Sequence, residues 1–384
     1  MKLLYVANQR LPTEKAYGIQ IAKMCEVFAL AGWETELVYP YRKNLNTQTV
    51  HDYYRVQTNF KVKQLFAPDV YLPGILNRPT VLLKNVYSAI RLFVYVLRRP
   101  VDVIYSRDEL PAVLLGFFRN NVCFEAHKFS SARQIFYWCM RWTHVKIVAI
   151  SSGVAHKFLN IGFPRERIIV VPDGVDFEQF NIPDQTDQYR KELGLPLGKK
   201  IIGYVGHFTT MGMDKGLSEL LEAFAIVHGK HPETILLLVG GRADEIQRYR
   251  IVSERLGLGD DVIFVTWQPH YSIPKYLKSA DILVMPFPNV PHYATYMSPL
   301  KLFEYMASGR PIVATDLPAI HEVLNRDNSI IVSSDSVHSL ADGLQSALDD
   351  PRLSTEKAAK AKDAVRRYTW NSRVGRILYF LSGR

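Results

Sequence analysis

Apolar runs alternate with amphipathic stretches along the first half of the chain. The run "KLLYVAN" predicts a buried strand near the start, and a loop containing Gly18 leads into an amphipathic helix from about Ile19 to Ala31. The strand "ETELVYP" follows, and strand–helix–strand at this spacing is typical of parallel sheets. Further strands are predicted in "DVIYSR", "VCFEAH", "KIVAISS" and "IIVVPDGVD". Ser151 and Ser152 suit the N-terminus of the helix "GVAHKFLNIG".

The alternation restarts after a polar, turn-rich stretch at residues 178–198, which we interpret as a linker. Beyond it, the predicted strands are "IIGYVGHF", "TILLLVGG", "VIFVT" and "ILVMPF". The predicted helices between them are "LSELLEAFAIVHGKH", "EIQRYRIVSERLG" and "IPKYLKSA". Because 384 residues are too many for one typical core, the chain is predicted to form two α/β domains with parallel sheets. The C-terminal "DAVRRYTWNSRVGRILYFLSGR" is predicted to form one or two basic amphipathic helices.

The stretch "MSPLKLFEYMASGRPIVATDLP", from Met297 to Pro318, predicts a loop, a short helix, a strand and a second loop. Ser298 suits the cap of this helix, Pro299 is tolerated in its first turn, and Gly309 suits its end. Glu304 is a charged residue between apolar neighbours on the same helix, and this position makes it a candidate for a functional role.

Composition narrows the classes of protein that this chain can be. Nearly half of the residues are hydrophobic, which is typical of a globular protein. The cysteines Cys25, Cys123 and Cys139 have neither a pairing rhythm nor a metal-binding spacing, which suits a reducing cytoplasm. We expect no signal peptide and no segment long enough to span a bilayer. The net charge of +10 suits anionic substrates or an anionic membrane, and no nucleic-acid-binding signature accompanies it.

Parallel-sheet domains bind ligands at the carboxyl ends of their strands, and two such domains facing each other form a cleft there. The free backbone amides of residues 298–301 can hold a phosphate at the helix N-terminus, with added charge from Lys301 and Lys215. Glu304 can then accept hydrogen bonds from a ribose; the alternative is a surface glutamate on an amphipathic helix. Lys215 opposes the dipole at its own helix entrance, which suits a bound anion, although a solvated lysine is the alternative.

Two further candidates lie in the first domain. His127 directly follows the strand "CFEA", where it can bind a sugar hydroxyl or transfer a proton. The alternative is a satisfied core or loop histidine, which is the commoner case. The loop amides around Gly18 can contact a phosphate or an acceptor, and a plain turn is the alternative.

One basic apolar stretch raises the question of membrane contact. Lys84, Arg91 and Arg98 are spaced seven apart and share a helix face in "VLLKNVYSAIRLFVYVLRR". This predicts either an interfacial membrane helix or a domain helix with a solvated basic stripe, and we favour the stripe for this stretch alone. A second aromatic and basic cluster consists of Trp138, Arg141, Trp142 and Lys146. With the net charge, these features lead us to expect peripheral binding to an anionic membrane.

Four segments in the same order resemble the group 1 glycosyltransferases, the large family 4 of retaining, nucleotide-sugar-dependent enzymes. They are "VPDGVDFEQF", "GYVGHF" with "DKGLSELLEAF", "SPLKLFEYMASGRPIVATDLPAIHEVL" and "YTWNSRVGRIL". The resemblance implies the GT-B fold, two Rossmann-like parallel-sheet domains facing a central cleft. It implies an acceptor-binding domain at residues 1–180, a nucleotide-sugar-binding domain at 195–365, and a C-terminal helix of about 366–384 that completes the first domain.

The resemblance also implies roles for single residues. The helix start at Ser298, Pro299, Leu300 and Lys301 holds the diphosphate through its backbone amides. Glu304 binds the ribose, Lys215 and the residue at His207 stabilise the leaving phosphate, and His127 lies near the donor sugar. No divalent metal and no cofactor are implied, and the sequence contains no Asp-x-Asp motif and no pyridoxal-lysine segment.

Two positions depart from the family pattern. His207 replaces the usual arginine and carries charge only when protonated. Tyr296 replaces the sugar-contacting acid, so it can donate a hydrogen bond but is no anion near neutral pH. We therefore favour a front-face mechanism in which the leaving phosphate helps to deprotonate the acceptor.

The resulting expectation is a cytoplasmic transferase that works at the inner face of the plasma membrane. It would move a sugar from a UDP- or GDP-linked donor to a saccharide or lipid-linked acceptor, in the synthesis of cell-surface polysaccharide or glycolipid. The alternative, motivated by Tyr296 and His207, is a non-catalytic nucleotide-sugar-binding subunit.

Overall fold

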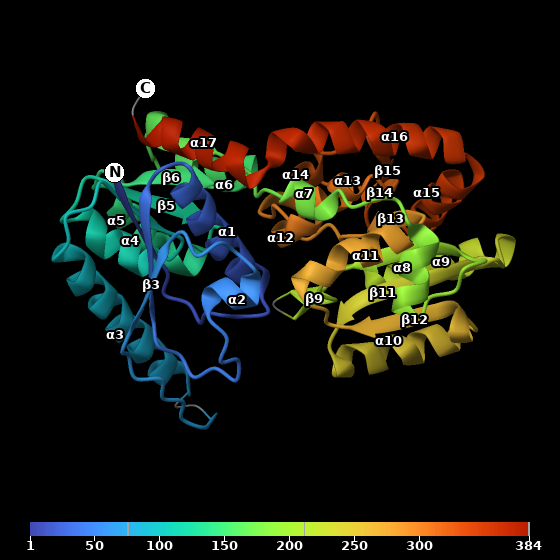
Figure 1. Ribbon diagram of the computed structural model, residues 1–384, viewed down its shortest axis with the longest axis horizontal. Coiled ribbons are helices and arrows are strands. Elements are labelled where there is room, and N and C mark those ends of the chain that lie inside the picture. The colour runs from blue at the N-terminus through green and yellow to red at the C-terminus, as the bar shows by residue number, and fades with distance from the viewer. Residues whose placement is uncertain (75–76, 211, 383–384) are drawn as a thin grey trace. The chain divides into compact units, whose positions relative to one another are not determined.

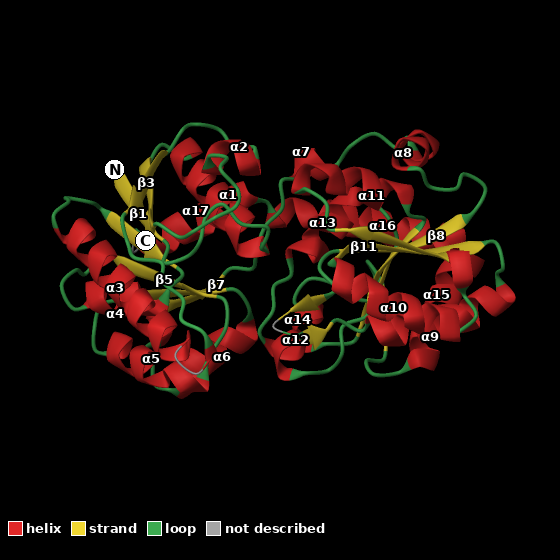
Figure 2. Ribbon diagram, turned by 90° about the horizontal axis from the view of Figure 1, so that it is seen from below, coloured by secondary structure: helices red, strands yellow, loops and turns green. Residues whose placement is uncertain are grey.

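The computed structural model describes residues 1–74, 77–210 and 212–382. The chain divides into two compact units: residues 1–173 with 370–384, and residues 174–369. Each unit is built around one parallel sheet, and Figure 2 shows helices on both faces of each sheet.

The first unit has a seven-stranded sheet in the order β3-β2-β1-β4-β5-β6-β7. Its strands are β1 (Lys2–Val6), β2 (Glu34–Pro40), β3 (Lys61–Leu65), β4 (Val103–Ser106), β5 (Val122–Ala126), β6 (Lys146–Ala149) and β7 (Ile168–Val170). Its helices are α1 (Ala16–Leu30), α2 (Val50–Tyr54), α3 (Asn77–Leu97), α4 (Glu109–Gly116), α5 (Gln134–Arg141), α6 (Ser152–Asn160) and α17 (Trp370–Leu381). As predicted, the Ser151 side chain caps α6 by accepting from the Val154 amide.

The second unit has a six-stranded parallel sheet in the order β12-β11-β8-β13-β14-β15. Its strands are β8 (Lys200–Val205), β11 (Thr234–Gly241), β12 (Val262–Thr266), β13 (Ile282–Met285), β14 (Ile312–Thr315) and β15 (Ile330–Val332). A small antiparallel pair, β9 (Thr209–Thr210) and β10 (Met213–Asp214), follows β8.

Two apolar cores cover the faces of this second sheet. One face packs against α7 (Phe177–Phe180), α11 (Ile273–Ser279), α13 (Leu300–Ser308) and α16 (Pro351–Ala364). The other packs against α9 (Leu217–Lys230), α10 (Ala243–Arg255) and α15 (Val337–Asp349). The remaining helices of the unit are α8 (Thr186–Leu193), α12 (Pro291–Thr295) and α14 (Pro318–His321).

Most of the predicted strands are present in the structure. The edge strand β3 was not predicted from the hydrophobic pattern. Its sequence "KVKQL" is polar because an edge strand faces solvent, and charged residues there discourage pairing with other chains. Lys61 of this strand forms an exposed ion pair with Glu34 of β2.

The stretch predicted as a linker is part of the second unit. Residues 178–198 contain most of α7 and all of α8, so the division between the units falls earlier, after Asp173. Arg190 is the reason that so polar a helix docks: its buried guanidinium bonds the Asp281 carboxylate at 2.7 Å and the carbonyl of Ser279.

The C-terminal helix returns to the first unit. Residues 365–368 form a 3-10 turn in the second unit, and α17 begins at Trp370. The Lys146 amino group at the start of β6 donates to the carbonyls of Phe380 and Leu381, and α17, drawn in red in Figure 1, contacts α1. Lys146 is therefore a cap for this helix rather than a member of a free basic cluster.

The helix α3 differs from the solvated basic stripe that we favoured. Lys84 is buried, because the segment with Asp69 and Tyr71 covers the start of the helix: its amino group lies 2.8 Å from the Asp69 carboxylate and 3.7 Å from the centre of the Tyr71 ring. The exposed face is instead largely apolar. Its large exposed side chains are Leu82, Leu83, Tyr87, Ile90 and Val94.

The helix α3 bears on the expectation that no uninterrupted apolar segment is long enough to span a bilayer. Within the described residues it is long and apolar enough, by length and composition alone, to cross a bilayer, with a mean hydropathy of 1.4 over its best window. Lys84 and Arg91 interrupt the apolar run in the sequence, but they do not lower its average enough to exclude it.

Candidate functional site

Helix α13 begins at Leu300, so its N-cap residue is one position later than the predicted cap Ser298. Pro299 is its extended N-cap residue, and no side chain caps the helix there, so the predicted capping role of Ser298 is wrong. Proline brings no backbone N–H of its own to this position. The Leu302 amide donates to the Pro299 carbonyl at 2.9 Å, so the amides of Leu300 and Lys301 are the first-turn donors that have no intrahelical acceptor. The helix start therefore has the donors and the dipole that an anion needs.

Lys301 points its amino group into the glycine loop that follows β8. Its nitrogen is buried 3.7 Å from the centre of the Tyr204 ring and has no hydrogen-bond partner among the described residues. A Cβ on Gly206 would lie 2.6 Å from that nitrogen, and the φ of +142° at Gly206 also favours glycine. Glycine at this position makes room for the lysine.

Lys215 is buried as well, which contradicts the alternative of a solvated lysine. It precedes α9, whose first amides, Gly216 and Leu217, donate to the Asp214 carboxylate at 2.7 and 2.8 Å. A Cβ on Gly216 would lie 1.7 Å from the Pro286 carbonyl oxygen, so only glycine allows this close approach. The Asp214 carboxylate accepts from both amides and so fixes the conformation of this loop. It was not among the residues predicted from the sequence.

The two lysines lie close enough to influence each other. Burial lowers the pKa of Lys215 to about 8. Burial, followed by the charge of Lys215, lowers the pKa of Lys301 well below its ordinary value. Neither amino group forms an ion pair with a described residue. Two buried amino groups with no paired anion, beside a helix N-terminus, form a site for a di-anionic group, whose negative charge favours their protonated form.

Glu304 is buried, so it is not the surface glutamate of the alternative. Its Oε1 accepts from His270 Nε2 at 2.8 Å, and the other ring nitrogen of His270 lies 3.3 Å from the Gln179 amide nitrogen. Because a carboxylate only accepts, these partners place the neutral ring's proton on Nε2. The sequence analysis missed His270, although its place in the loop after the strand β12 is a typical ligand position.

His207 and Tyr296 are the two residues that depart from the family pattern. His207 follows Gly206 next to Lys301, and its carbonyl accepts from the Tyr204 hydroxyl at 2.8 Å. Tyr296 is half-buried at the end of α12, just before α13. The second unit therefore gathers His207, Lys215, Lys301 and Glu304 around the start of α13.

His127 lies in the first unit at the end of β5. Its Nε2 is 2.5 Å from Glu125 Oε1. Burial lowers the pKa of His127, the charge of Arg107 lowers it further, and Glu125 opposes both. Burial alone would raise the pKa of Glu125, but Arg373 and His127 hold it far below the usual range, so the carboxylate is ionised. The neutral ring then donates from Nε2 and keeps Nδ1 as an acceptor.

Three side chains here have the chemistry of metal ligands. Ligand atoms of Glu125, His127 and Asp173 lie within 4.8 Å of one another. However, Arg373 Nη2 lies 2.7 Å from the Glu125 carboxylate and 3.8 Å from that of Asp173. The guanidinium supplies the positive charge that a cation would supply, so the cluster does not fit a divalent metal.

Gly18 was predicted to precede its helix. It lies instead inside the first turn of α1. Its amide donates to the Lys15 carbonyl, and a Cβ there would lie 1.9 Å from the Tyr54 hydroxyl oxygen. That hydroxyl accepts from the Thr13 amide and donates to the Thr13 carbonyl. Gly18 therefore makes room for Tyr54, which fixes the loop after β1.

Two α/β units, each built on a parallel sheet, are the architecture of the GT-B fold. Residues 185–367 match the family model "Glycosyl transferases group 1". The matched residues make up just under half of the chain, so the match is a resemblance to the group 1 glycosyltransferases, the family that the sequence motifs also resemble.

Curated relatives of the chain are also named as glycosyltransferases. The chain is 27% identical over 243 residues to a D-inositol 3-phosphate glycosyltransferase of Corynebacterium urealyticum, covering 61% of this chain and 55% of the relative. It is 29% identical over 235 residues to the protein of that name in Corynebacterium kroppenstedtii, covering 59% and 50%. The matches thus span about half the length of these relatives.

Solved structures share the fold over the full chain. The Anabaena protein Alr3699/HepE in complex with UDP and glucose has a TM-score of 0.78 at 16% identity, with all of both chains covered. Sucrose-phosphate synthase of Thermosynechococcus elongatus has a TM-score of 0.76 at 19% identity, covering all of this chain and 98% of the other.

Proposed function

We propose that the protein is a retaining glycosyltransferase that takes a sugar from a UDP- or GDP-linked donor. The observation that carries this proposal is the pair of buried, unpaired cations Lys215 and Lys301 at the start of α13. A nucleotide diphosphate supplies the missing negative charge. Charge stabilisation of the leaving diphosphate, where negative charge grows, is usually a large contribution to catalysis.

The remaining roles follow from the same geometry. Glu304 uses Oε1 for His270, and its second oxygen is free to accept from a ribose hydroxyl. His207 donates to the diphosphate beside Gly206, and Tyr296 donates to a sugar hydroxyl. His127, held by Glu125, accepts a hydrogen bond through Nδ1. No group here is an obvious nucleophile, which suits front-face transfer assisted by the leaving phosphate.

We propose further that the reaction needs neither a metal nor a cofactor. Arg373 already neutralises the carboxylates that could bind a cation in the first unit, and the lysines play the corresponding role for the diphosphate. Activity that survives treatment with a chelator supports this; activity restored only by a divalent ion contradicts it.

The direct test is nucleotide binding, measured by calorimetry with UDP, GDP and their hexose conjugates. Replacing Lys301 by Met should weaken binding at least tenfold, because it removes a buried charge opposite the diphosphate. The control Lys360→Met changes an exposed lysine on α16 and should bind as the native protein does. Equal affinities in all three proteins contradict the proposed site.

The second candidate is a nucleotide-sugar-binding subunit without turnover, favoured by the neutral residues Tyr296 and His207. It predicts binding of a nucleotide sugar but no release of nucleotide with any acceptor. Sugar transfer to a saccharide or lipid-linked acceptor decides for the enzyme.

We also propose that the protein works at the inner face of the plasma membrane, on a lipid-linked or saccharide acceptor in cell-surface synthesis. The support is the exposed apolar face of α3, with Leu83, Tyr87, Ile90 and Val94 flanked by the exposed Arg91 and Arg98. Apolar side chains beside cations suit an anionic lipid surface. Trp138 and Trp142 are exposed on the same unit, with their rings 5.8 Å apart.

Vesicle sedimentation tests the membrane proposal. The native protein should bind vesicles with anionic lipid better than neutral ones, and the double variant Leu83→Glu/Ile90→Glu should lose this binding. The control Leu45→Glu changes a leucine that is 99% exposed in a loop and should have no effect. Equal partition onto neutral and anionic vesicles contradicts the proposal.

A further inference from the structure

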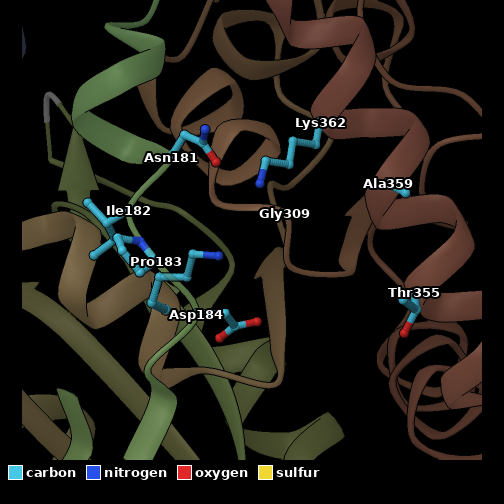
Figure 3. A pocket seen from close by; sticks show the side chains of 9 residues that line it. Asn181, Ile182, Pro183, Asp184, Gly309, Thr355, Ala359 and Lys362 are labelled. Carbon is cyan, nitrogen blue, oxygen red and sulfur yellow. The ribbon is translucent and has the colours of Figure 1, made fainter. Parts of the chain in front are cut away.

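A cavity of about 440 Å³ lies in the second unit at the opposite end of α13 from the lysine pair. Gly309, which ends α13, lines it together with Asn181 and Asp184 of the segment between α7 and α8. Lys278 of α11, with Thr355 and Lys362 of α16, also contributes to its polar lining. Figure 3 shows Lys362 reaching from α16 toward Asn181, with its amino group directed into the space between them.

The cations around this cavity lack a full set of partners. Lys278 is only 4% exposed, and its amino group has no hydrogen bond or ion pair among the described residues. The Lys362 amino group has none either. The one carboxylate, Asp184, is already engaged by Arg310 Nη2 at 2.7 Å, and the buried Nε of Arg310 has no partner.

The pKa of Lys278 reflects its burial and the charges around it. Burial lowers its pKa, and the charges of Arg310 and Lys362 lower it further, against the opposing effect of Asp184. Arg310, which is outside the lining, neutralises Asp184, so Lys278 and Lys362 leave the cavity with an excess of two positive charges. A ligand that supplies negative charge would give the two lysine ammonium groups the partner that the described residues do not supply.

We propose that this cavity binds a small phosphate monoester. Its dianion matches the excess of two positive charges, and lysine ammonium groups bind phosphate as point charges. The volume lies within the range of about 300–1,000 Å³ that small-molecule sites occupy. The Asn181 side-chain amide can bond a hydroxyl on the ester's organic part. This site is separate from the proposed nucleotide site, which lies at the start of α13.

The test uses the full-length protein and calorimetric titration with glucose 6-phosphate, with glucose as the uncharged comparison. The native protein should bind the phosphate ester and not glucose. Lys362→Ala should weaken binding at least tenfold. Ala359→Glu places a carboxylate on an exposed residue of α16 that lines the cavity, and should block binding. Lys360→Ala, on the same helix but outside the lining, is the matched control.

Two variants separate this site from the nucleotide site. Lys301→Met should retain binding of the phosphate ester, whereas Lys362→Ala should retain binding of the nucleotide. Inorganic phosphate, titrated in parallel, tells whether the ester's organic part contributes: equal affinity would mean that phosphate alone is recognised. Equal binding of glucose 6-phosphate to the native protein, Lys362→Ala and Ala359→Glu overturns the proposal, as does the absence of binding to all of them.

Discussion

The Arg373 guanidinium of α17 donates to the Glu125 carboxylate of β5 at 2.7 Å, and both side chains are almost completely buried. The two residues are 248 positions apart in the sequence. Gln20 and Tyr105 also donate to this carboxylate, which in turn holds His127. The C-terminal helix is thereby tied to the residue that orients the histidine.

Arg373→Met should destabilise the protein strongly. It leaves the Glu125 carboxylate buried without its main counter-charge, a change that costs about 3–5 kcal/mol for a buried pair. Denaturant unfolding measures the loss. Arg376→Met, on an exposed part of the same helix, is the control and should have a small effect. Adding Glu125→Gln to Arg373→Met should recover part of the stability; a further loss would contradict this explanation.

Lys215→Met should stabilise the free protein near neutral pH. The pKa of Lys215 is lowered to about 8, so the unfolded chain binds its proton more tightly, and the charged residue costs the folded state about 3 kcal/mol below pH 8. The stability of the native protein should therefore rise between pH 8 and the ordinary lysine pKa of 10.5. The advantage of the variant should shrink over the same window.

The same lysine should make nucleotide binding depend on pH. Affinity for UDP or GDP should fall as pH rises above about 8, because the ammonium group that faces the diphosphate loses its proton. Calorimetry at several pH values measures this. An affinity that does not vary in this window would mean that Lys215 stays out of contact with the ligand.

Gly206→Ala should weaken nucleotide binding while leaving the protein folded. The new methyl group would lie 2.6 Å from the Lys301 amino group and displace that flexible side chain from the glycine loop. Gly229→Ala is the matched control, because a Cβ there meets open space on helix α9 and should add about 0.5–1 kcal/mol of stability. Unchanged affinity in the Gly206 variant would show that the position of Lys301 does not matter.

His127→Ala should lower the rate of sugar transfer by about 10²–10⁴-fold, the usual range for a group that assists proton transfer. UDP or GDP affinity should stay unchanged, because the lysine site belongs to the other unit. Single-turnover kinetics separates the two quantities. A loss of nucleotide affinity with an unchanged rate of sugar transfer would contradict the role of His127 in proton transfer.

The hydrophobic pattern by itself predicted most of the parallel strands, because strands buried on both faces are continuous apolar runs. The same pattern could not find β3, since an edge strand carries polar residues, nor the burial of Lys84, since the covering segment with Asp69 is remote in the sequence. The motifs indicated Lys215, Lys301 and Glu304 as site residues. His270 was missed because its link to Glu304 is a tertiary contact.

The sequence therefore determined the α/β architecture, the short helix from Leu300 and the charged residues near its start, all of which depend on local periodicity and spacing. Only the tertiary structure decided that Lys215 and Lys301 are buried without a counter-charge and that Arg373 pairs with Glu125. The physical reason is that burial and ion pairing depend on which distant segments meet. No local pattern records that choice.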